Sequence, residues 1–254
     1  MIREERLKTL SEYIDAHRIA NIAEMMSCLG VSKATVRRDL IELERRGRIR
    51  FVRGGAATVR RAPASESLYR IKEQAFVEEK KRIGAAAAKL LGEGDCSFLY
   101  AGTSVRAMVP CLPEAMRLTV VTNDLMIAAD LSARENTEVT VTGGQLRQGY
   151  YALRGYRAEE TVAALKLDIA FLGCDAVDPE NGCYIANADE VGLLRRIIGS
   201  AARRVVLADH SKFGAGAFFN FCVAGEIDTL ITDSGLEEST AALVRKAGIR
   251  LILV

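Results

Sequence analysis

Residues 29–40 read Leu29-Gly30-Val31-Ser32-Lys33-Ala34-Thr35-Val36-Arg37-Arg38-Asp39-Leu40. Apolar residues recur at helical spacing over residues 22–29, and Gly30 interrupts this pattern. Ser32 is a good N-cap for a following helix, because its hydroxyl oxygen accepts a hydrogen bond from a free backbone N–H. Val36 and Leu40 give that second helix an apolar stripe. The stretch therefore predicts two helices joined by a short turn, which is a helix-turn-helix.

The outward face of the second helix carries residues that suit DNA. Ala34 is small enough to let the helix approach the major groove, and donors for phosphates and base edges surround it. From Arg48 to Arg53, basic and apolar residues alternate as in a half-exposed strand, so we expect a two-stranded wing. The residues that we predict to contact DNA are Ser32, Lys33, Thr35, Arg37, Arg38, Arg50 and Arg53.

Charge is divided unevenly along the 254 residues, although the net charge is only +2. Residues 1–61 contain 14 Lys and Arg against 8 Asp and Glu, which is +6, so the remainder carries −4. A small basic head on a mildly acidic body indicates an anion-binding module attached to a domain with a different partner.

The composition excludes several protein classes. With 49% hydrophobic and 27% charged residues, the chain is typical of globular proteins and unlike disordered or fibrous ones. We find no secretory signal and no apolar run approaching the roughly 18 residues of a membrane span, and we expect a cytoplasmic protein without membrane contact. Six scattered cysteines and two histidines form no metal-ligand spacing, so we expect reduced thiols, no metal and no cofactor.

The body alternates short apolar runs with helical patterns. This alternation predicts an α/β fold with a mostly parallel sheet and helices on both faces. The predicted strands are 97–100, 118–122, 138–142, 168–172, 204–208, 229–232 and 250–253, and the predicted helices are 76–91, 106–111, 125–131, 158–165, 191–201 and 236–247. We expect a winged helix-turn-helix domain over residues 1–57, a small and polar linker over 58–75, and an effector domain over 76–254.

Ligands of such sheets bind beyond the carboxyl ends of the strands. Polar or glycine-rich residues follow five predicted strands, and a backbone N–H group near Gly102 with adjacent hydroxyls suits a phosphate. Lys212 adds a counter-charge. We therefore expect a phosphorylated ligand at Gly102, Thr103, Ser104, Thr122, Asn123, Gly143, Gly144, Asp175 and Lys212.

Both parts of the chain resemble the DeoR family of bacterial transcription regulators. In the head, the matching strings are residues 29–40, Leu43-Glu44-Arg45-Arg46-Gly47 and Gly54-Gly55-Ala56. In the body, they are Gly102-Thr103, Val121-Thr122-Asn123, Thr142-Gly143-Gly144, Phe171-Leu172-Gly173 and Asp209-His210-Ser211-Lys212-Phe213-Gly214. The resemblance implies an effector domain similar to ribose-5-phosphate isomerase that senses a sugar phosphate. Tyr100 departs from this pattern, because family members usually carry Asp there.

Comparison with the isomerases raises the question of catalysis. Their carboxylate pair is retained in Asp175 and Asp178, and Glu190 matches their helical Glu, so we add these residues to the predicted effector site. No lysine lies between Lys166 and Lys212 to stabilise an enediolate, which favours binding without turnover and no catalytic residue. A sugar-phosphate isomerase with a DNA-binding head is the alternative. A third possibility is an NAD-linked redox sensor. The chain lacks the G-x-G-x-x-G turn that such a sensor requires, which argues against it.

These observations predict a regulator rather than an enzyme. The head is expected to bind double-stranded operator DNA, and the body a phosphorylated sugar or related metabolite. We expect a repressor of a sugar or carbohydrate catabolic operon. A homo-oligomer, either dimer or tetramer, is expected because paired heads read paired half-sites.

Overall fold

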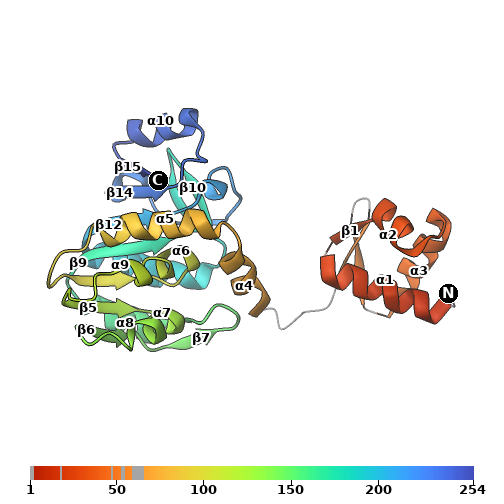
Figure 1. The fold of residues 1–254 in the computed structure, drawn as a ribbon, viewed down its shortest axis with the longest axis horizontal. Coiled ribbons are helices and arrows are strands. Elements are labelled where there is room, and N and C mark those ends of the chain that lie inside the picture. The colour runs from red at the N-terminus through yellow and green to blue at the C-terminus, as the bar shows by residue number, and fades with distance from the viewer. Residues whose placement is uncertain (1–2, 18, 47, 53–54, 59–65) are drawn as a thin grey trace. The chain divides into compact units, whose positions relative to one another are not determined.

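The computed structural model describes residues 3–17, 19–46, 48–52, 55–58 and 66–254. The chain forms two compact units, residues 1–64 and 65–254 (Figure 1). The first unit contains α1 (Arg3–His17), β1 (Ile19–Asn21), α2 (Ile22–Leu29), α3 (Lys33–Arg45), β2 (Ile49–Val52) and β3 (Gly55–Thr58).

Local sequence signals set the ends of α2 and α3. The Asn21 side chain accepts a hydrogen bond from the Glu24 backbone N–H at 2.9 Å, and the Glu24 carboxylate accepts one from the Asn21 N–H, which is a capping box. Gly30 ends α2 in the left-handed conformation with a φ of 64°, and Ser32 caps α3. The predicted helix-turn-helix is therefore confirmed.

Asp39 faces the interior of the first unit, although it follows two exposed arginines. Its side chain is only 2% exposed and pairs with Arg6 of α1 through two hydrogen bonds, one of them 3.2 Å long between Arg6 Nη2 and Asp39 Oδ1. The carboxylate raises the pKa of Arg6 further above its usual value through this hydrogen bond. The pair thus joins α1 to α3, a contact that the sequence pattern did not predict.

The wing is part of a three-stranded antiparallel sheet in the order β1-β3-β2. Gly55 begins the central strand, where it pairs with Asn21 of β1 and Val52 of β2. A Cβ atom at Gly55 would lie 2.0 Å from the carbonyl oxygen of Ala20. Any larger residue would therefore force β1 away from β3.

The second unit is built on a seven-stranded parallel sheet in the order β15-β14-β12-β9-β4-β5-β6. Its elements are α4 (Glu66–Gln74), α5 (Val77–Ala88), β4 (Cys96–Leu99), α6 (Thr103–Arg106), β5 (Leu118–Thr122), α7 (Leu125–Leu131), β6 (Thr137–Val141), β7 (Gln145–Arg147), β8 (Ala152–Arg154), α8 (Tyr156–Ala163), β9 (Leu167–Gly173), β10 (Ala176–Asp178), β11 (Gly182–Ile185), α9 (Val191–Ser200), β12 (Ala201–Leu207), β13 (Phe219–Cys222), β14 (Thr229–Thr232), α10 (Glu238–Lys246) and β15 (Arg250–Leu253).

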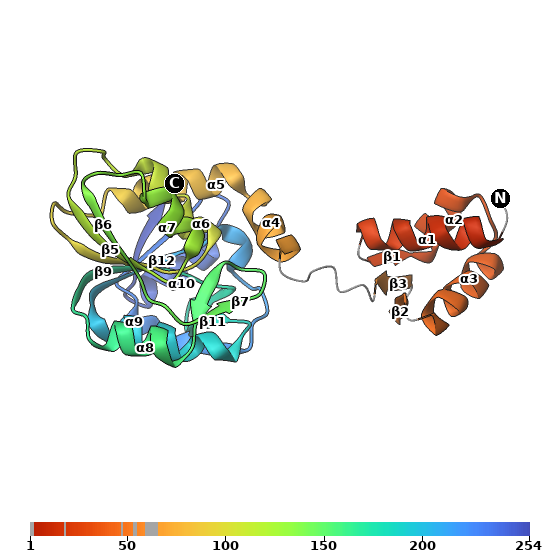
Figure 2. The same ribbon diagram turned by 90° about the horizontal axis from the view of Figure 1, so that it is seen from below.

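Helices cover both faces of this sheet (Figure 2). Along β9, Ile169 and Phe171 pack with α5, α6 and α7 on one face, whereas Ala170 and Leu172 pack with α8 and α9 on the other. Strands buried on both faces are the expected consequence of parallel pairing with crossover helices. The predicted α/β fold with a mostly parallel sheet is confirmed, and each predicted strand corresponds to one strand of the sheet.

The structure differs from the sequence-based expectation in three places. Residues 66–74 of the expected linker form α4, which belongs to the second unit. The expected helix 106–111 is replaced by α6 and a 3-10 turn at Val109–Cys111, because Pro110 removes a backbone donor. Two small antiparallel sheets, β7-β8 and β10-β11-β13, were not predicted. Among the described residues, no helix is long and apolar enough to cross a membrane.

We predict that Gly55→Ala destabilises the first unit by about 2 kcal/mol, because the added Cβ overlaps the Ala20 carbonyl oxygen. Thermal unfolding followed by amide NMR signals of the first unit measures this change. Gly199→Ala is the control, since a Cβ there meets no heavy atom within 4 Å. Equal stability of the two variants would contradict the close approach of β1 and β3.

Candidate functional site

Helix α3 exposes basic side chains on the face away from the core. Lys33, Arg37 and Arg38 are exposed, whereas Val36 and Leu40 are fully buried. The Arg38 guanidinium donates only one long hydrogen bond within the described residues, 3.4 Å from Nε to the Ala34 carbonyl oxygen. The face therefore offers donors that a nucleic-acid backbone or a base edge can accept.

Two other predicted DNA-binding residues, Ser32 and Thr35, lie at the start of α3. Ser32 Oγ accepts the Thr35 backbone N–H at 3.4 Å and lies 3.0 Å from Thr35 Oγ1, so the two hydroxyls are engaged with each other at the start of α3. Arg53 lies outside the described residues, and so does the side chain of Arg50. The structure thus brings together Lys33, Arg37 and Arg38 with the two hydroxyl residues.

A cavity of about 150 Å³ in the second unit lies at the carboxyl ends of β4, β9 and β12. Six residues of the predicted effector site line it, namely Gly102, Thr103, Ser104, Asp175, Glu190 and Lys212. Lining residues that were not predicted include Tyr69 and Lys72 of α4, Lys80 of α5, Arg147 of β7, and Asp209 just after β12. Tyr150 also lines the cavity.

Lys80 of α5 is a buried ammonium at this cavity, with 6% of its surface exposed. Its Nζ donates to the carbonyl oxygen of Ala75 at 2.8 Å and to that of Lys72. Burial lowers the pKa of Lys80 to about 8; nearby Asp209 opposes this shift, and Lys212 adds to it. A positive charge that is costly to bury is thus held at the cavity wall.

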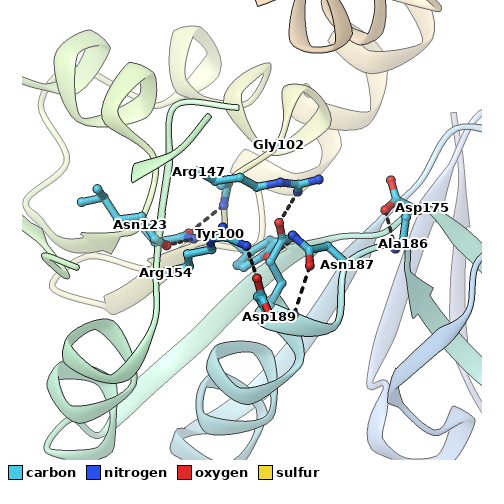
Figure 3. A network of polar contacts seen from close by, with 12 residues as sticks. Tyr100, Gly102, Asn123, Arg147, Arg154, Asp175, Ala186, Asn187 and Asp189 are labelled. Carbon is cyan, nitrogen blue, oxygen red and sulfur yellow. Dashed lines mark hydrogen bonds and ion pairs between the residues drawn. The ribbon is translucent and has the colours of Figure 1, made fainter. Parts of the chain in front are cut away.

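Lys72 of α4 forms an ion pair with Asp175, with 2.6 Å between Nζ and Oδ1. The second oxygen of Asp175 accepts the Ala186 backbone N–H at 2.9 Å (Figure 3). Burial lowers the pKa of Lys72, but the carboxylate outweighs burial and the net shift is upward. Burial raises the pKa of Asp175, but the ammonium outweighs it and the net shift is downward. Both groups are therefore charged near neutral pH.

Glu190 also lines the cavity, where it joins a second cluster of polar side chains. Its Oε2 accepts a hydrogen bond from the Tyr100 hydroxyl at 3.0 Å, and Arg147 pairs with Oε1. The Arg147 guanidinium lies 3.6 Å from the centre of the Tyr150 ring. Burial raises the pKa of Glu190, although Arg147 opposes the shift. Tyr100 thus contacts the carboxylate that the isomerase resemblance singled out.

Asp209 is fully buried at the cavity and only half satisfied. Its Oδ1 accepts the Ser211 backbone N–H at 3.1 Å and the Ser211 hydroxyl. Its Oδ2 has no hydrogen-bond partner among the described residues. A buried acceptor without a partner costs free energy, so a ligand hydroxyl that donates to it would be favoured.

Five predicted effector residues do not line the cavity: Thr122, Asn123, Gly143, Gly144 and Asp178. Asn123 instead supports the loop that does, because its Oδ1 accepts the Ala101 N–H at 2.9 Å (Figure 3). Thr122 donates to the Leu99 carbonyl oxygen at 2.6 Å, and both side chains are buried. Asp178 accepts the backbone N–H groups of Glu180 and Asn181, which is loop capping.

Comparison with known proteins matches both units. The family model of the DeoR C-terminal sensor domain matches residues 75–234, and that of the DeoR-like helix-turn-helix domain matches residues 6–62. The HTH-type transcriptional regulator GlpR of Haloferax volcanii is 35% identical, over 99% of this chain and 98% of that protein. The HTH-type transcriptional repressor GlcR of Bacillus subtilis is 33% identical, over 100% and 97%. The full-length sorbitol operon regulator SorC of Klebsiella pneumoniae is 14% identical with a TM-score of 0.41, over 95% and 98%.

We predict that Lys80 titrates near pH 8 in the folded protein, well below the usual lysine value of 10.5, because burial disfavours its charged form. Between these values the unfolded chain holds more protons, so this group makes the free energy of unfolding rise with pH across that window. NMR of ¹³C-labelled lysine side chains measures the midpoint, and Lys80→Met identifies the signal. A midpoint at or above 10 would show that the ammonium is solvated.

Proposed function

Because the chain belongs to the DeoR family of helix-turn-helix transcriptional regulators, we propose that it represses a sugar or carbohydrate catabolic operon and that a phosphorylated sugar-type metabolite controls its operator binding. Its curated relatives are transcriptional regulators, so the chain is a regulator and not an isomerase. We also propose that it binds double-stranded operator DNA and acts in the cytoplasm.

The observation that carries the effector proposal is the mixture of charges around one small cavity. Lys80 and Lys212 supply cations at the cavity, and ammonium groups bind phosphate as point charges, whereas Lys72 is paired with Asp175. The unpartnered Oδ2 of Asp209 accepts from a hydroxyl. Glu190, at the cavity wall with Tyr100, adds a second acceptor. A small molecule with one phosphate and several hydroxyls satisfies both kinds of group.

The DNA-binding proposal rests on α3. Its exposed Lys33, Arg37 and Arg38 stand on the face opposite the apolar stripe, and Ala34 leaves room for close approach to the groove. In this proposal Arg50 and Arg53 contact phosphates from the wing. A homodimer or tetramer presents paired α3 helices to paired half-sites, since closed symmetry in the protein matches palindromy in the operator.

We predict that Arg38→Ala weakens specific DNA binding ten- to a hundredfold, in line with about 1–3 kcal/mol for a base-reading arginine. Fluorescence anisotropy with a duplex selected from random DNA by the wild-type protein measures the affinity. Arg45→Ala is the matched control, because Arg45 is engaged with Glu42 at 2.9 Å near the end of the same helix. Unchanged affinity of the Arg38 variant would contradict the assignment of α3 as the recognition helix.

We predict that a thermal-shift screen of phosphorylated sugars finds a ligand that stabilises the protein by about 2–3 kcal/mol at a hundredfold excess over its Kd. Lys212→Ala should lose this stabilisation, because Lys212 lines the cavity. Lys246→Ala, which changes an exposed lysine of α10, should retain it. If the Lys212 variant keeps the full shift, Lys212 is not part of the site.

A further inference from the structure

Helix α4 enters the effector cavity with its C-terminal end. Tyr69, Ile71 and Lys72 of α4 and Ala75 and Phe76 just after it line the cavity. This end of a helix carries unpaired carbonyl groups and a partial negative charge. The cavity is therefore already occupied, in part, by a group of anionic character that belongs to the protein itself.

The donors of the cavity bind this helix end. Lys80 donates to the carbonyl oxygens of Lys72 and Ala75, and Thr103 Oγ1 donates to that of Lys72 at 3.5 Å. The Lys72 ammonium is committed to Asp175. Lys80 and the Thr103 hydroxyl are donors that a phosphate would use. An anion in the cavity would also lie beside the negative end of α4, which is repulsive.

Two contacts away from these donors hold α4 in place. The Tyr69 ring packs edge-on against Tyr151, with the ring centres 5.2 Å apart. Arg106 of α6 donates to Glu73 at 2.8 Å and to the Tyr69 hydroxyl at 3.3 Å. Neither Tyr151 nor Glu73 lines the cavity. These contacts can therefore be removed without substituting a residue that lines the cavity.

The junction between α4 and α5 is strained. Phe76 has a φ of 54°, in the left-handed region that residues other than glycine rarely adopt. Such a conformation persists only where the surroundings impose it. One such constraint is the edge-on contact of the Phe76 ring with His210, whose ring centres lie 5.1 Å apart.

We propose that the C-terminal end of α4 occupies the anion subsite of the cavity, that Lys80 is the residue for which α4 and the ligand compete, and that an anionic ligand displaces α4. This inference rests on the proposed effector function. Helix α4 is the first element of the second unit, so its displacement acts on the chain that leads to the DNA-binding unit.

The competition has a reciprocal consequence. If the ligand favours displaced α4, any change that loosens α4 must tighten ligand binding by the same linkage. A merely structural role for α4 predicts the opposite, because a damaged cavity wall binds less tightly. This difference in sign separates the two accounts.

The test measures the affinity of the full chain for inorganic phosphate by calorimetry at constant ionic strength, and hydrogen exchange over residues 69–75. Tyr151→Ala removes the ring contact without a change of charge, and Tyr156→Ala, at an exposed tyrosine, is its control. Glu73→Ala removes the Arg106 contact, and Glu78→Ala, which loses the same charge on α5, is its control.

We expect Tyr151→Ala to bind phosphate about three- to tenfold more tightly, with faster exchange over residues 69–75. Glu73→Ala should shift both readouts in the same direction by a smaller factor of about two. Neither control should change them. If the Tyr151 and Glu73 variants both bind phosphate with equal or weaker affinity than the wild type, α4 and the anion do not compete, although the anion site itself stands. Failure of the wild type and all variants to bind phosphate would instead contradict the proposed effector function, and the inference with it.

Discussion

A buried ammonium needs hydrogen-bond acceptors, and at Lys80 the second unit meets this requirement with the end of α4. The parallel sheet brings the loops after β4, β9 and β12 to one edge, where they form the cavity. Helix α5 directs Lys80 into that edge, where carbonyl oxygens at the end of α4 accept from it. Those contacts, together with the Lys72–Asp175 pair, explain why α4 belongs to the second unit although it follows the connecting segment directly in sequence.

Much of the fold could be predicted because its determinants are local. The cap at Ser32, the break at Gly30 and the apolar stripe of α3 lie within twelve residues. Each of them determines the conformation of its immediate neighbours in the sequence. The strands of the parallel sheet were found because buried parallel strands read as short apolar runs. Helix α4 was missed because it is short and polar and its stability depends on distant partners; Leu68 and Ile71, spaced by three residues, were the available signal.

The lining of the candidate cavity could be predicted only in part, for a physical reason. Loops that follow adjacent strands converge, so Gly102, Asp175 and Lys212 were found from strand ends alone. The same reasoning placed Asn123 in the site, whereas its side chain supports the neighbouring loop. Lys72 was beyond prediction, because 103 residues separate it from Asp175. The structure thus supplies a lysine beside Asp175 that the sequence between Lys166 and Lys212 lacks.

The uneven charge of the chain fits the proposal that its two units have different partners. A basic head suits the phosphates of a duplex, and the mildly acidic body places Lys80 and Lys212 at one cavity. We propose that these two sites are energetically coupled. The most direct test measures the operator Kd of the full chain with and without a saturating sugar phosphate. Energetic coupling predicts that the operator Kd changes by about fivefold or more, within the usual range of allosteric coupling. An identical Kd with the cavity demonstrably filled would contradict it.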